Sequence, residues 1–202
     1  MVRNKTITRY AKIKGLLLIL IAFILLRGPG LFAQNHFNIE YETRHTFDET
    51  YQIRPQFNIF GQHAQAGKTF GYYYWAAANK DWGEAYGGLL INTAKWLQVM
   101  VGGGLETHEE AYRLNLITFS GIRNWFFMQW YEYGGSGFWY YFLLDYALTA
   151  NFKAGAILER YYGLGPNFYY TIKNTPVVLN LATLYDLEAK LYRMKVTVRL
   201  AF

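Results

Sequence analysis

The chain has 202 residues, no cysteine and a formal net charge of +6. Six of its 20 lysines and arginines fall within residues 1–33, which contain no acid, so the remaining 14 cations face 14 aspartates and glutamates. The rest of the chain is therefore formally neutral, which argues against a basic nucleic-acid-binding domain. The lack of cysteine excludes a disulfide framework and a thiolate metal site.

Residues 1–33 have the three parts of a secretory signal peptide. A cationic stretch of 14 residues comes first, followed by the uncharged apolar run GLLLILIAFILL (15–26) and by RGPGLFA, which ends on a small residue. A spanning helix needs about 20 apolar residues, so the alternative of an uncleaved membrane anchor is disfavoured. We expect cleavage after Ala33 or Gln34 and a single mature domain over 34–202.

Stretches of about ten residues follow, each with an alternating or one-sided apolar pattern that is typical of strands. Turn-forming residues separate them, as in GQHAQAG (61–67), GGSG (134–137) and GLG (163–165). The breaks near 122–124 and near 151 are weaker, so ten or eight strands are the alternatives to twelve. The twelve predicted strands cover 37–47, 51–60, 68–78, 82–92, 95–106, 110–120, 123–133, 137–150, 151–162, 166–173, 175–185 and 187–202.

This pattern predicts an all-β fold, a closed antiparallel transmembrane β-barrel. Aromatic residues make up 20% of the chain and charged residues 17%, against about 25% charged residues in soluble domains. Stretches such as FGYYYW and FWYYFLL are apolar on both faces, whereas a soluble β-sandwich, the alternative, would present a polar outer face. Lipid offers the backbone no hydrogen-bond partner, so a spanning sheet must close on itself.

The last predicted strand, YRMKVTVRLAF, alternates apolar with polar residues and ends on Phe202. With the signal and the strand rhythm, it resembles the bacterial outer-membrane β-barrels, a porin-like superfamily. That resemblance implies a Gram-negative outer membrane, contact with lipid and lipopolysaccharide, and Phe202 as the membrane-insertion signal read by the barrel-assembly machinery. An even number of strands would put both chain ends in the periplasm and the turns at 48–50, 79–81, 106–110, 134–137, 163–165 and 185–186 outside.

The polar face of the predicted strands would line the lumen. Glu40 and Glu42 are expected to pair with Arg54 on the second strand, and with the cations of the last strand across the closure. The parity of the pattern also turns Gln129, Trp75, Trp96 and Trp139 inward. The charged residues expected in the lumen are Glu40, Glu42, Arg44, Arg54, Arg113, Asp145, Arg193, Lys195 and Arg199.

Two classes of function remain open at this point. Eight strands enclose a filled interior and sixteen an open channel, so twelve allow a narrow porin-like channel for small solutes or a structural barrel with a charge-paired lumen. The alternative is an outer-membrane hydrolase, protease-like or lipase-like, at the extracellular rim. The residues of this candidate hydrolase site are His45, Asp48, Asp81, Glu84 and His108. We favour the non-enzymatic role. No motif predicts a cofactor or a metal site, and ETHEE (106–110) does not match a zinc motif.

Overall fold

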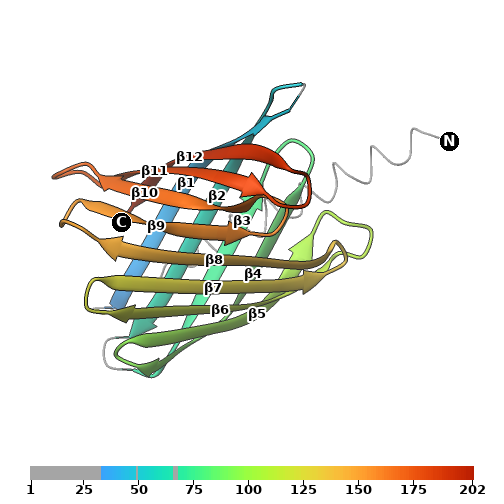
Figure 1. Cartoon of the computed structure of the whole chain (residues 1–202). Helices are drawn as coiled ribbons and strands as arrows, with labels where there is room; N and C mark the ends of the chain where they lie inside the picture. The colour runs from blue at the N-terminus through green and yellow to red at the C-terminus, as the bar shows by residue number, and fades with distance from the viewer. Residues whose placement is uncertain (1–32, 49, 66–67) are drawn as a thin grey trace.

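The computed structural model describes residues 33–48, 50–65 and 68–202 and contains the twelve predicted strands (Figure 1). Nearly all of the predicted signal peptide lies outside the described residues. No helix in the described part is long and apolar enough to cross a membrane. The strands are β1 (Ala33–Phe47), β2 (Gln52–Gln65), β3 (Phe70–Ala78), β4 (Gly83–Ala94), β5 (Leu97–Glu106), β6 (Tyr112–Ile122), β7 (Trp125–Gly134), β8 (Gly137–Ala147), β9 (Phe152–Glu159), β10 (Gly163–Thr171), β11 (Val177–Asp186) and β12 (Leu191–Ala201).

The strands form one closed antiparallel barrel in which each strand pairs with its neighbours in sequence and β1 pairs with β12. Hydrogen bonds between the backbones of Phe37 and Phe202, at 3.0 and 2.8 Å, extend the closure beyond the end of β12. The predicted fold class is therefore confirmed. In Figure 1 the wall formed by β7–β12 crosses in front of the wall formed by β1–β4 at a steep angle, as strongly tilted barrel strands do. The start of β1 and the end of β12 lie at one end of the barrel, here called the terminus end.

Side chains alternate between an apolar outer face and an inner face along each strand. On β11, Leu179 and Leu181 are exposed, while Ala182 and Leu184 are fully buried. On β12, Val198 and Leu200 face outward, and Lys195 and Thr197 face inward. Leucine, valine and aromatic side chains are exposed in this way around the barrel, a surface suited to lipid rather than to water.

Two predicted turns are in fact parts of strands. GQHAQAG was predicted to be a turn, but β2 continues to Gln65. Within this strand Gly61 leaves room for an aromatic ring, since a Cβ there would lie 2.7 Å from Cε1 of Tyr74. GLG (163–165) begins β10, and the preceding turn is formed by residues 160–162, with positive φ at Tyr161. In both segments glycine permits close approach of neighbouring groups, a role that sequence reading cannot separate from turn formation.

Two buried clusters fill parts of the barrel interior. Tyr73, Tyr86, Leu90, Met100 and Ile117, from β3–β6, form a buried cluster. The glycine run of β5 makes room for it, because a Cβ at Gly102 would collide with the Tyr73 hydroxyl. This close packing is the role that the run VGGGLE suggests. A second buried cluster, which includes Tyr141, Leu143 and Ile157, lies on β8–β11.

Gly88→Ala is expected to reduce the yield and the stability of the folded barrel. A Cβ at Gly88 would lie 2.5 Å from Cα of Gly102 and closer still to the carbonyl oxygen of Val101, and a backbone cannot move aside as a side chain can. Overpacking of this kind costs about 1–3 kcal/mol. The measurement is the urea midpoint of the protein refolded in lipid vesicles. Gly103→Ala is the control, since its Cβ would meet its nearest atoms at an ordinary 3.4 Å; equal midpoints for the two variants would refute the expectation.

Candidate functional site

A cavity of about 570 Å³ lies in the interior of the barrel. Its lining includes Asn79, Ser136 and Tyr161, which lie in turns at the end opposite the termini. It also includes Thr171 and Val178, which lie where β10 and β11 meet at the terminus end. The cavity therefore reaches both ends of the barrel.

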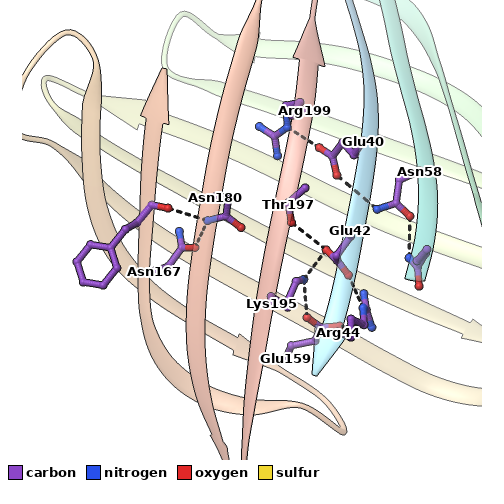
Figure 2. A network of polar contacts seen from close by, with 12 residues as sticks. Glu40, Glu42, Arg44, Asn58, Glu159, Asn167, Asn180, Lys195, Thr197 and Arg199 are labelled. Atoms are coloured by element: carbon purple, nitrogen blue, oxygen red, sulfur yellow. Dashed lines mark hydrogen bonds and ion pairs between the residues drawn. The ribbon is translucent and has the colours of Figure 1, made fainter. Parts of the chain in front are cut away.

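The polar wall of the cavity lies at the closure between β12 and β1 (Figure 2). Nε of Arg199 lies 2.5 Å from Oε1 of Glu40, and Nζ of Lys195 lies 3.2 Å from Oε2 of Glu42. Lys195 also contacts Glu159 of β9 at 3.0 Å. The pairs with Glu40 and Glu42 cross the line along which the first and last strands join.

Arg44 completes this network. Its guanidinium pairs with Glu42 on its own strand, and its Nη1 lies 3.1 Å from Oε1 of Glu159. Three carboxylates, of Glu40, Glu42 and Glu159, thus face three cations. Glu42, Glu159 and Lys195 are each less than a tenth exposed, so their charges are compensated by one another rather than by water.

Two of the ion pairs expected in the polar wall were predicted wrongly. The register places Glu40 opposite Asn58 and Glu42 opposite Gln56, so neither glutamate reaches Arg54. The β2–β3 pairing ends at Phe57, and Arg54 lies beyond it, exposed and outside the cavity lining.

The second ion pair that was predicted wrongly is that of Arg193 with the glutamates of β1. Arg193 turns inward as expected but binds Asp186 at 2.9 Å and Thr46 at 3.1 Å instead of these glutamates. Only Lys195 and Arg199, of the three cations expected at the closure, lie beside Glu40 and Glu42.

Three glutamates surround a single arginine toward the end opposite the termini. Arg113 of β6 contacts Glu132 at 2.6 Å, Glu84 at 3.4 Å and Glu106 at 3.7 Å. Arg113 also donates to the Ser136 hydroxyl at 2.8 Å. All four charged residues of this cluster, here called the Arg113 cluster, are at most 4% exposed.

Only two members of the Arg113 cluster were predicted from the sequence. Arg113 and Glu84 were both placed on the inner face, Glu84 also among the candidate rim residues. Glu106 was assigned to a turn, and the strand that carries Glu132 was given the wrong face. The signal that could have found Glu132 is its even spacing from Met128 and Trp130. In the described part of the chain no group of His, Asp and Glu has an arrangement that could hold a metal ion.

The wall facing the polar one is aromatic. The ring of Trp130 lies edge-on to Trp75, with centroids 5.2 Å apart, and to Trp139 at 5.7 Å. Tyr86 stacks on Trp75 at 4.9 Å, and Tyr141 stacks on Trp139 at 6.1 Å. Trp75, Trp130 and Trp139 all line the cavity.

The inward face of β7 was predicted wrongly. Phe126, Met128, Trp130 and Glu132 line the cavity, whereas Gln129 faces outward and accepts a hydrogen bond from the Tyr131 hydroxyl at 3.0 Å. The segment WFFMQWYEY is apolar on both faces, so its pattern carries little information about parity.

Of two further residues that were expected inside the barrel, one lies outside and the other lies inside. Trp96, expected inside, is 52% exposed beside the β4–β5 turn. Asp145 does line the cavity, buried, and accepts a hydrogen bond from Asn167 at 3.0 Å. Asn167 in turn accepts one from Asn180 at 2.5 Å (Figure 2).

The architecture of this chain is similar to that of solved structures. No family model matches the sequence, and no curated protein matches it. Among solved structures, the chain is similar to the KdgM porin, with a TM-score of 0.57 and 15% identity over 82% of this chain and 99% of that one. It is similar to a KdgM porin in complex with disordered oligogalacturonate, with a TM-score of 0.58, 14% identity and the same coverage. The fold is that of an outer-membrane β-barrel.

In this barrel the residues of the candidate hydrolase do not assemble. Glu84 faces the interior within the Arg113 cluster, while His45 lies on the outward face of β1 beside Thr43 and Tyr51. The wall of the barrel separates these two side chains. Asp48, Asp81 and His108 are exposed in three different turns. The expected convergence at the rim was therefore wrong.

Phe202 lies on the outside of the barrel. Its ring is 62% exposed and stacks on Phe37 of β1, with centroids 6.3 Å apart. This aromatic side chain is accessible on the outer surface, where the first and last strands join.

Proposed function

We propose that this barrel is a narrow passive channel for small solutes in the bacterial outer membrane. The observation that carries the proposal is the cavity whose lining reaches both ends of the barrel. Its walls combine paired charges with aromatic rings, and a lining of mixed polar and apolar groups is what a solute pathway needs. The likeness in fold to the KdgM porin agrees with this role.

The channel is expected to be narrow. Twelve strands lie between the eight that enclose a filled interior and the sixteen of an open porin. The buried cluster of β3–β6 takes up one side of that interior, and the ion pairs of β12 and β1 project from the other. We therefore expect a conductance below that of sixteen-stranded porins.

The orientation follows as part of the same proposal. The signal peptide is removed after Ala33 or Gln34, the terminus end faces the periplasm, and Phe202 serves as the insertion signal for the barrel-assembly machinery. The outer apolar face would then contact lipid, with lipopolysaccharide around the opposite end.

The channel can be tested with single cysteines, since the chain has none of its own. Thr171 lines the cavity, and Thr183 lies on the exposed outer face of β11. In planar bilayers we expect stepwise conductance from the unmodified protein. A bulky charged methanethiosulfonate reagent is expected to lower the conductance of Thr171→Cys by at least half and to leave Thr183→Cys unchanged. Absence of conductance at every voltage would refute the channel.

A further inference from the structure

We propose that the solute of this channel is a neutral oligosaccharide, bound between the aromatic wall and the polar wall. This inference rests on the proposed channel function and names its substrate class. The two walls are formed by different parts of the barrel, Trp75, Trp130 and Trp139 from β3, β7 and β8 on one side, and residues of β12, β1 and β2 on the other.

The aromatic wall suits the flat apolar face of a sugar ring. Pyranose rings present C–H groups on their faces and hydroxyl groups around their edges. The C–H groups carry partial positive charge and therefore pack favourably on the negative face of an aromatic ring. Because Trp75 and Trp139 both stand edge-on to Trp130, the three indoles present surfaces in different directions along the cavity. Such a wall can contact successive rings of a sugar chain.

The polar wall suits the hydroxyl edges of the same ring. Gln56 donates to Asn58 at 2.7 Å, and Asn58 donates to Glu40 at 3.4 Å, so amides and a carboxylate follow one another along the wall (Figure 2). Amide side chains offer both donors and acceptors, as a hydroxyl group requires. Asn38 and Asn180 add further amides to the lining.

The charges of the lining favour a neutral solute over an acidic one. Six carboxylates, of Glu40, Glu42, Glu84, Glu132, Asp145 and Glu159, face the cavity. The cations are five, those of Arg44, Arg113, Lys153, Lys195 and Arg199. No excess of positive charge is therefore left to attract a chain of sugar carboxylates such as oligogalacturonate, the ligand in the KdgM complex. A wholly apolar solute would leave the polar wall without hydrogen-bond partners.

The test is current blockade in planar bilayers by maltohexaose and by an oligogalacturonate of six residues, added to the unmodified protein. We expect maltohexaose to interrupt the current at a concentration at least tenfold lower than the acidic chain. Preferential blockade by oligogalacturonate, or no blockade by either sugar in a conducting channel, would overturn the inference and leave the proposed channel standing.

Two tryptophan variants locate the site. Trp139→Ala is expected to raise the blocking concentration of maltohexaose about tenfold, whereas Trp125→Ala, on an exposed ring of β7, is expected to change it less than twofold. Equal effects would overturn the aromatic wall as the binding surface. If the protein does not conduct, the channel is refuted, and quenching of tryptophan fluorescence by maltohexaose in detergent still decides the sugar site: saturable quenching supports it and its absence overturns it.

Discussion

Arg113→Met is expected to abolish the heat-resistant folded barrel at neutral pH. Among the described residues the guanidinium is the only cation within ion-pair distance of Glu84, Glu106 and Glu132, and all three carboxylates are at most 4% exposed. Removing one partner of a buried ion pair costs about 3–5 kcal/mol, because the remaining charge stays uncompensated. With three carboxylates left, the loss is a large fraction of the stability of a domain of this size. The measurement is the gel shift between folded and heat-denatured protein, together with the urea midpoint in vesicles.

The control for Arg113→Met is Arg54→Met, which makes the same change at an exposed arginine and is expected to leave the midpoint unaltered. The direction of the pH effect is a second check. Acid neutralises buried carboxylates, so the deficit of Arg113→Met relative to the unmodified protein should shrink as the pH falls. A variant with the midpoint of the unmodified protein at neutral pH would contradict the role of the Arg113 cluster.

The double variant Glu40→Lys/Glu42→Lys is expected to open the closure between β1 and β12. The two changes remove the partners of Arg199 and Lys195 and place two more cations beside them. Glu159 would remain as the one carboxylate of the network facing five cations. We expect a loss of about 3–5 kcal/mol, again because buried charges would lack compensation. The measurement is the temperature at which the folded band disappears on a gel without prior boiling.

A matched variant changes the same amount of charge away from the closure. Glu109 and Glu110 are adjacent exposed glutamates of the β5–β6 turn, and Glu109→Lys/Glu110→Lys is expected to keep the melting temperature within a few degrees. Equal losses in the two double variants would mean that net charge, rather than the closure network, decides stability.

The sequence by itself determined the fold and the side of the wall on which most charged residues lie, and it favoured twelve strands over ten or eight. A strand repeats its side-chain direction every two residues, so a local alternation such as that of β12 reports both the element and its inward face. Asp145, Lys195 and Arg199 turned inward for this reason. The same rule failed where the contrast between faces is weak, as in β7, and put Gln129 inside in place of Trp130.

The tertiary structure alone decided which side chains meet. Glu40 and Glu42 contact β12 and not Arg54, because the stagger of each strand against the next sets the pairing, and this stagger is a property of the closed barrel. The Arg113 cluster unites carboxylates of β4, β5 and β7 around a residue of β6, and the aromatic wall joins tryptophans of β3, β7 and β8. Local alternation carries no information about these distances, since they depend on the shape of the closed interior as a whole.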